Sequence, residues 1–315
     1  MNAQTTSSVK TKNTRPVKVR KTSRVKRRTN LSAYGFVAPF LIIFFLMLFI
    51  PLAYSGYISL FIERIVGGIN FVGLENYARA IEDPRFHEGL GRTALILLIQ
   101  VPIMLGLALI FALALDSGYA RGSNLLRLLI FMPYAVPSVV STLMWGYMYG
   151  QNFGLVGQLA TSIGLPAPDL LSPGVILFSI MNIVTWAFVG YNMIIMYSAL
   201  KAIPSEVYEA AEIDGASQFR LAWSIKIPAL RPALLLTTIF SVIGSFQIFV
   251  EPSLLSPLAP SAIGQSFTPN YYAYNLAFVN SELNYAAAIA FSLGVVIMIV
   301  SYAVQLSTQR KRVAE

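Results

Sequence analysis

Six stretches of this chain are apolar over about the length of a membrane span, and this feature limits the fold more than any other. A helix needs about 20 apolar residues to cross the hydrocarbon core of a bilayer. Soluble domains carry about 25% charged residues, whereas this chain of 315 residues carries 12%. Length and lack of charge separate such stretches from the buried helices of a soluble core. The sequence therefore predicts an all-α, polytopic membrane helical bundle with six transmembrane helices, at residues 36–62, 94–115, 128–149, 174–200, 233–250 and 286–306.

Positive charge lies almost entirely on one side of these predicted spans. With the N-terminus inside, all but four of the 23 Lys and Arg fall in cytoplasmic segments. The four exceptions share the outer loop after the first span with five acids. The other outer loops, about 150–173 and 251–285, contain neither Lys nor Arg. Because cytoplasmic segments carry an excess of these residues, we expect both termini in the cytoplasm.

Ten of the basic residues fall within residues 1–30, where no acid is present. Such a segment cannot bury a core, and we expect a disordered tail there and a transmembrane domain over 31–315. A cytoplasmic tail that sets topology and touches anionic lipid fits best, so the net charge does not indicate nucleic acid. A signal peptide does not fit, because the following apolar stretch is too long and lacks a cleavage site. A transit peptide fits the composition, but nothing else in the chain points to an organelle.

Residue types exclude several kinds of chemistry. The chain has no cysteine and one histidine, His87, so we expect no disulfide, metal site, cofactor or catalytic residue. Ion-coupled carriers usually keep Asp, Glu or His within the membrane, and the middle parts of these six predicted spans contain none of them, with Glu251 lying near an end. The chain also has no Gly-Lys dipeptide and hence no phosphate-binding loop for ATP. A secondary transporter and an intramembrane enzyme are therefore the weaker alternatives.

The segment 201–232, between the fourth and fifth predicted spans, is longer than a connector needs to be. Ser205 is placed to cap a helix, Gly215 to end it, and Ser217 to cap a second helix that runs towards Pro228. Small alanines alternate with acids along the first helix, which gives a compact surface. We expect a rigid element that docks against another protein.

The same segment resembles the EAA loop of the permeases of ATP-binding-cassette (ABC) importers. The resemblance lies in Glu209-Ala210-Ala211, in Gly215 four residues later, and in the ending Ile225-x-Ile227-Pro228. In that family the loop forms a coupling helix that fits a groove on the nucleotide-binding subunit. The resemblance implies that ATPase coupling falls to Glu209, Ala210, Ala211, Asp214, Gly215 and Pro228.

Four further short sequence motifs, in the same order along the chain, resemble the carbohydrate-uptake branch of this family. They are Phe-Val-Gly-Leu-Glu-Asn-Tyr at 71–77, Met-Pro-Tyr-Ala-Val-Pro at 132–137, Phe-Gly-Leu-Val at 153–156 and Ala-Leu-Lys-Ala-Ile-Pro at 199–204. The first of these motifs is similar to the one found in the first of the two dissimilar permeases of maltose-type systems. That relative has extra N-terminal helices and a large outer domain, for which we expect no counterpart here, so no outer-domain function is transferred. The resemblance implies a type I importer fold, a second homologous permease, two ATP-binding subunits and an extracellular solute-binding lipoprotein.

Spans four and five hold the candidate substrate pathway. A sugar needs neutral hydrogen-bonding groups and an aromatic ring near the membrane midplane. By alignment with the maltose-type permease, Tyr191 matches a sugar-contacting tyrosine, and Ser241, Gly244 and Ser245 fall at matching positions. Several of these side chains differ from that relative, so the sugar need not be maltose. Helix packing for the tyrosine and interhelical hydrogen bonds for the amides and serines are the alternative interpretations. The candidate pathway residues are Tyr191, Asn192, Ser241, Gly244, Ser245 and Gln247.

Together these features predict a non-enzymatic permease subunit in a bacterial or archaeal cell membrane. We expect it to translocate a sugar, a di- or oligosaccharide, that a binding protein delivers. A non-sugar solute such as a glycerophosphodiester is the alternative. A phosphate would require Arg or Lys in the pathway, and none lies inside the spans.

Overall fold

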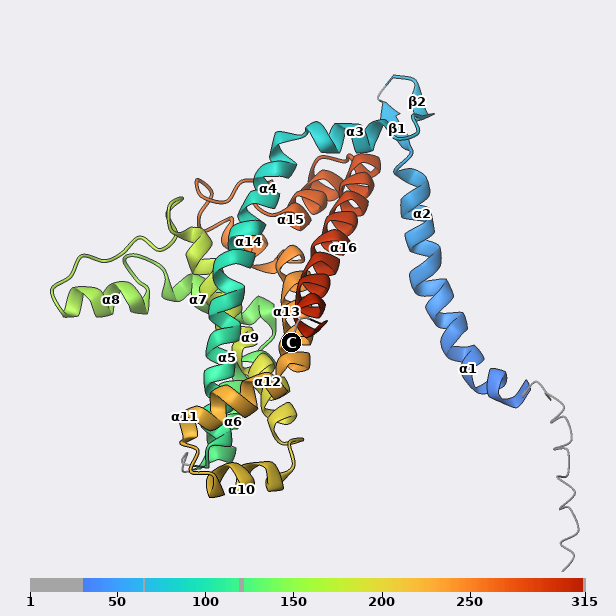
Figure 1. The fold of residues 1–315 in the computed structure, drawn as a ribbon. Helices are drawn as coiled ribbons and strands as arrows, with labels where there is room; N and C mark the ends of the chain where they lie inside the picture. The colour runs from blue at the N-terminus through green and yellow to red at the C-terminus, as the bar shows by residue number, and fades with distance from the viewer. Residues whose placement is uncertain (1–30, 65, 119–121, 314–315) are drawn as a thin grey trace, which may run out of the picture. The chain divides into compact units, whose positions relative to one another are not determined.

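The computed structural model describes residues 31–64, 66–118 and 122–313, and these residues are mostly helical (Figure 1). The predicted basic tail, 1–30, lies outside the described residues. Strands are confined, within the described ranges, to one antiparallel hairpin of β1 (Phe61–Arg64) and β2 (Gly68–Phe71). The sequence analysis predicted an all-α chain; the mostly helical character is confirmed, whereas the hairpin was not predicted. By its internal contacts the chain divides into a unit that ends at Leu52 and a unit that begins at Ala53.

The described residues of the first unit form an apolar helical stretch. They make up α1 (Leu31–Phe44), the π-helical turn η1 (Phe45–Phe49) and the start of α2 (Ile50–Ile58). The large apolar side chains from Phe36 onward are exposed. A helix that is apolar all round is typical of a membrane span or of the core of a large protein.

Five continuous helical stretches in the described part of the chain are long and apolar enough to cross a membrane. They are Gly35–Ile58, Pro84–Asp116, Ile176–Leu200, Arg231–Leu255 and Leu283–Ser307. Beyond the first, their elements are α4 (Pro84–Leu95), η2 (Ile96–Gln100), α5 (Val101–Asp116), α9 (Ile176–Leu200), α13 (Arg231–Phe246), α14 (Val250–Leu255) and α16 (Leu283–Val313).

The predicted third span, 128–149, is not one helix. Its residues form the end of α6 (Ser123–Ala135) and the whole of α7 (Ser138–Met148), and these helices meet at 95°. Pro137 has no N–H to donate and pushes the preceding residue out of the helical region. Val136 is accordingly extended, with φ −77° and ψ 126°. The structure has six spans only if this bent pair counts as one.

Three prolines each follow a π-helical turn by two residues. Pro51 follows η1, Pro102 follows η2, and Pro228 follows η3 (Ala222–Lys226). A proline cannot donate to the carbonyl four residues before it and clashes with that carbonyl, so the preceding turn widens. These prolines therefore shape the helices without ending them.

Shorter elements connect and cover the spans of the second unit. They are α3 (Glu75–Glu82), α8 (Leu155–Ser162), α10 (Ser205–Ile213), α11 (Gln218–Leu221), α12 (Ile227–Ala229), α15 (Pro269–Tyr274) and η4 (Asn275–Val279). Within this unit, α3 and α15 lie at one end and α10 at the opposite end (Figure 1). We call these the α3 end and the α10 end.

Helix α9 is the centre of the second unit and packs against α5, α6 and α13. It meets α6 at Gly190, where a Cβ atom would lie 2.0 Å from the carbonyl oxygen of Ile130. Only glycine allows two backbones to approach this closely. At the α10 end, the buried side chains of Ala108, Met196 and Leu230 join α5, α9 and the start of α13 in one apolar cluster.

Candidate functional site

A cavity of about 310 Å³ lies among the helices of the second unit. Half of its lining residues come from α9 and α13, and the others come from η2, α5, α7, α14 and the residues 247–249 between α13 and α14. Its size is at the lower end of the range for small-molecule sites in proteins. The cavity is therefore large enough to hold a ligand.

All six residues predicted for the substrate pathway line this cavity. Helix α9 contributes two of them, α13 contributes three, and one directly follows α13: Tyr191, Asn192, Ser241, Gly244, Ser245 and Gln247. The three in α13 are spaced by three and four residues, which places them on one face of the helix. The fold thus gathers the candidate residues from two separate helices.

Tyr191 packs against a neighbouring aromatic ring and also lines the cavity. The ring of Tyr191 stacks on the ring of Tyr134 from α6, with centroids 4.7 Å apart and planes at 20°. Tyr134 also contacts Phe188 edge-on. An aromatic ring held in this way is preorganised to cover the apolar face of a ligand.

Polar side chains that line the cavity form hydrogen bonds with the backbone of their own helices. The amide of buried Asn192 donates to the carbonyl oxygen of Phe188 at 3.0 Å and approaches Met104 Sδ of α5 at 3.7 Å. The hydroxyl of buried Ser245 donates to the carbonyl oxygen of Ser241 at 2.8 Å. A hydroxyl that donates one bond still has lone pairs that accept. Of the hydrogen bonds that the side chains of Asn192 and Ser245 make with other described residues, only the weak contact with Met104 Sδ fits the interhelical alternative.

Gln100 is a cavity residue that the sequence analysis missed. Its amide nitrogen donates to Thr185 Oγ1 at 3.2 Å. Its carbonyl oxygen is buried and has no hydrogen-bond partner among the residues that the structure describes. A buried polar group without a hydrogen bond lowers the stability of the folded state by about 1–3 kcal/mol. The available signal was a lone glutamine in an apolar run, two residues before Pro102.

Glu251 also lines the cavity, although sequence reasoning only placed it near the end of a span. It is 9% exposed. Of the described residues that line the cavity, it alone carries a formal charge. Ionisable groups within a membrane bundle are costly and usually functional.

The segment 201–232 forms the predicted helix–glycine–helix element. Gly215 ends α10 with φ +75°, and the amide of Ala216 donates to the carbonyl oxygen of Ala211 at 2.9 Å. The amide of Gly215 donates to the carbonyl oxygen of Glu212, which completes a Schellman motif.

Of the two predicted helix caps in this segment, one is present in the structure and one is not. Ser217 caps α11, because its hydroxyl accepts from the amide of Arg220 at 3.3 Å. The cap expected at Ser205 is wrong. Pro204 holds the N-cap position, so Ser205 is already the first helical residue and makes no cap bond.

The predicted coupling residues divide into two groups. Glu209, Ala210, Asp214 and Gly215 are exposed on or just after α10, whereas Ala211 is buried. Pro228 is half-buried in α12, directly after η3. The exposed group forms a free surface on this single chain, and Pro228 shapes the segment behind it.

A buried ionic cluster that sequence reasoning missed lies behind this segment. The carboxylate of Asp116, at the end of α5, pairs with Lys226 Nζ of η3 at 2.7 Å and with Lys201 Nζ at 3.0 Å. Asp116 and Lys226 side chains are 4% and 5% exposed, and Lys201 is 55% exposed. The hydrogen bond to Asp116 raises the pKa of Lys201. The available signal was an acid at the end of one span and lysines at the ends of nearby segments.

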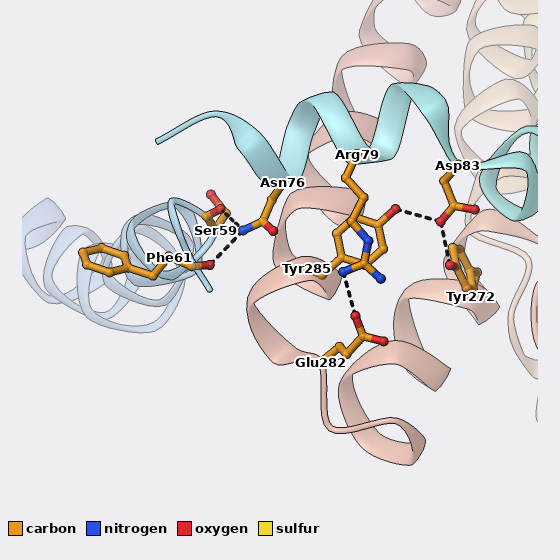
Figure 2. A network of polar contacts seen from close by, with 8 residues as sticks. All are labelled: Ser59, Phe61, Asn76, Arg79, Asp83, Tyr272, Glu282 and Tyr285. Atoms are coloured by element: carbon orange, nitrogen blue, oxygen red, sulfur yellow. Dashed lines mark hydrogen bonds and ion pairs between the residues drawn. The ribbon is translucent and has the colours of Figure 1, made fainter. Parts of the chain in front are cut away.

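At the α3 end, polar contacts tie α3 to the first strand and to the last span (Figure 2). The amide of Asn76 donates to the carbonyl oxygens of Ser59 and Phe61, both at 2.8 Å. Arg79 pairs with Glu282 at 2.8 Å and lies over the ring of Tyr285. Asn76 belongs to the Phe-Val-Gly-Leu-Glu-Asn-Tyr motif, so this motif anchors α3 to the backbone around the first strand.

Asp83 completes this network by accepting hydrogen bonds from the hydroxyls of Tyr272 and Tyr285, both at 2.7 Å. Partial burial acts to raise the pKa of Asp83. The hydrogen bonds from the two tyrosines and from the backbone amides outweigh burial and lower it. The folded-state contribution of this carboxylate is thus present above its ordinary pKa and is lost only as the pH falls through about 4 and below.

Comparison with known proteins places residues 104–313 in the family described as "Binding-protein-dependent transport system inner membrane component". One relative is the lactose transport system permease protein LacF of Rhizobium radiobacter. It is 31% identical over 294 residues, which cover 92% of this chain and 98% of that protein. Another is the sn-glycerol-3-phosphate transport system permease protein UgpA of Agrobacterium fabrum, 30% identical over 285 residues, or 89% and 95% of the two chains.

Among solved structures, one chain of a bacterial ABC transporter for import of the acidic polysaccharide alginate has the same fold. The TM-score is 0.79, the alignment covers 90% of this chain and 96% of that one, and the identity is 17%.

Proposed function

The chain belongs to the family of binding-protein-dependent transport system inner membrane components, and from this premise we propose that its cavity passes a saccharide through an ABC importer. Members of this family are multi-pass components of the inner membrane that transport and do not themselves catalyse a reaction. The observation that supports the proposal most is the position of all six candidate pathway residues around one cavity.

The chemistry of this cavity suits an uncharged saccharide. Tyr191 offers a ring for the apolar face of a sugar, and Asn192, Ser245 and Gln247 offer neutral hydrogen-bonding groups for its hydroxyls. The relative LacF is a lactose permease, and lactose is a disaccharide. We therefore place a di- or oligosaccharide in this cavity.

A phosphate-bearing solute is the alternative, and the relative UgpA transports sn-glycerol-3-phosphate. Such a solute is normally bound by arginine or lysine. Neither lines the cavity in the described residues, and the carboxylate of Glu251, when ionised, repels an anion. The cavity favours the saccharide.

The partners follow from the same proposal. Two ATP-binding subunits supply the energy, and one of them docks on the exposed surface of α10 around Glu209, Ala210 and Asp214. A second homologous permease completes the channel as a heterodimer. The extracellular solute-binding lipoprotein docks at the α3 end. A bilayer surrounds the exposed apolar surface of the spans.

Deletion of the gene for this chain tests the substrate class. We expect the deletion strain to lose uptake of one radiolabelled di- or oligosaccharide and to take up labelled sn-glycerol-3-phosphate at the parental rate. Plasmid-borne expression of the chain should restore uptake. Loss of sn-glycerol-3-phosphate uptake, with uptake of every saccharide intact, would contradict the proposal.

The orientation is also a proposal, with both termini and α10 in the cytoplasm and the bent pair of α6 and α7 forming one of six spans. The chain has no cysteine, so one introduced cysteine reports its own location. We expect Ser162→Cys, exposed at the end of α8, to react with a membrane-impermeant maleimide in intact cells. Glu212→Cys, exposed on α10, should react only after the membrane is opened. The reverse pattern would overturn the orientation and the docking surface.

A further inference from the structure

The segment 201–232 is attached to the spans by few side chains. Helix α10 packs extensively on no other element of the described chain. The buried side chains of the segment are the apolar Ala211, Leu221 and Leu230 and the charged Lys226. Apolar contacts are non-directional and allow sliding. Of the four, Lys226 alone forms an ion pair, which has a fixed geometry.

The partner of Lys226 is unusual for its position. Asp116 is the last residue of α5, where the helix dipole favours cations and disfavours acids. The acid therefore does not stabilise its own helix. Its carboxylate instead meets Lys226 at 2.7 Å in a nearly solvent-free site. This position is explained by the pair it forms and not by α5.

Four elements converge on the same few atoms. Besides α5 and η3, the cluster includes Lys201, which directly follows α9. Helix α10 reaches it through Tyr208, whose ring centroid lies 5.1 Å from Lys226 Nζ and whose hydroxyl donates to the carbonyl oxygen of Leu200 at 3.4 Å. The contacts of Tyr208 therefore link α10 to the ends of α5 and α9, and both of these helices line the cavity at other positions, Met104 and Tyr191 among them.

Pro228 helps to place the lysine. Lys226 is the last residue of η3, the π-helical turn that precedes this proline. A π-turn rotates the following side chains relative to a regular α-helix. The ending Ile-x-Ile-Pro of the segment is thereby connected to the ionic cluster.

We propose that Asp116 and Lys226 form the joint through which segment 201–232 moves the ends of α5 and α9, and that this joint sets how tightly ATP hydrolysis is coupled to transport. The proposal rests on the proposed function. Both are positioning residues, since neither lines the cavity and neither lies on the exposed surface of α10. Lys201 is half-exposed, and its pair with Asp116 is expected to add little.

The test uses the complete transporter, purified with its partner subunits and placed in proteoliposomes with the binding protein. ATP hydrolysis and uptake are measured together, with the labelled saccharide that the deletion experiment identifies. For Lys226→Met and Asp116→Asn, we expect ATP hydrolysed per saccharide imported to rise at least about fivefold, the lower range of measured coupling between sites. Lys201→Met is the matched control, which leaves the buried pair intact and should keep the wild-type ratio.

A double variant separates coupling from stability. Removing one partner of a buried pair is destabilising, but replacing both with apolar residues is often neutral. Asp116→Leu combined with Lys226→Met should therefore recover the Tm of the wild type while the ratio stays raised. A double variant with both the Tm and the ratio of the wild type would show a purely structural role and overturn the proposal. Failure of the wild-type complex to import any saccharide would instead refute the proposed function.

Discussion

Replacing Ser245 with tryptophan should abolish transport while the protein still assembles with its partners. Ser245 of α13 is 4% exposed and lines the cavity. An indole there fills space that a substrate must cross, in a cavity of only about 310 Å³. Uptake of labelled saccharide in proteoliposomes measures the effect, and we expect it to fall to the level of empty vesicles.

The matched control is Ser245→Ala, which removes only the hydroxyl that donates to Ser241. One hydrogen bond contributes about 0.5–1.5 kcal/mol, or roughly a two- to tenfold effect on affinity. We therefore expect a modest loss with alanine and a block with tryptophan. Co-purification of the ATP-binding subunits shows whether each variant is assembled. Wild-type uptake by assembled Ser245→Trp protein would show that the substrate passes elsewhere.

Replacing Gly215 with valine should uncouple the transporter, with a loss of uptake that approaches that of the blocked cavity. Gly215 has φ +75°, and a Cβ atom there would meet nothing within 4 Å. The effect therefore comes from the backbone and not from a clash. Left-handed backbone costs an L-residue about 1–2 kcal/mol, and β-branched residues are genuine outliers there. A penalty of that size lowers the population of the Schellman turn by roughly 5- to 30-fold.

Gly215→Asn is the control, because asparagine tolerates the left-handed region through local hydrogen bonds. We expect the asparagine variant to retain most uptake and the valine variant to bind the ATP-binding subunits more weakly in co-purification. Equal uptake by wild type and the valine variant would remove the coupling role from this turn.

Sequence reasoning predicted the parts of the fold that depend on local pattern. Apolar length placed the spans, and Gly215 and Ser217 marked the end of one helix and the start of the next. It failed where two local preferences compete. Apolar length at 128–149 suggested one span, but Pro137 bends the chain there by 95°. At Ser205, a good capping residue is displaced because Pro204 already supplies the non-helical backbone.

In the candidate site too, sequence reasoning found the residues that a local pattern marks and missed those whose role depends on contacts between distant segments. Residues on α9 and α13 were found because each helix carries its own polar pattern and because the resemblance to the maltose-type permease points to the same positions. Gln100, Glu251 and the pair of Asp116 with Lys226 were missed because their importance depends on contacts between distant segments. The π-turns before Pro102 and Pro228 place two of these side chains, and their geometry is not encoded in hydropathy.

The central claim is that this chain imports a saccharide by using ATP from separate subunits. The most direct measurement is accumulation of the labelled saccharide in proteoliposomes that contain the complete transporter, with ATP inside or outside and with or without binding protein. We predict accumulation only when ATP can reach the side that carries α10 and the loaded binding protein is on the opposite side. Accumulation driven by a proton or sodium gradient in the absence of ATP would contradict the claim.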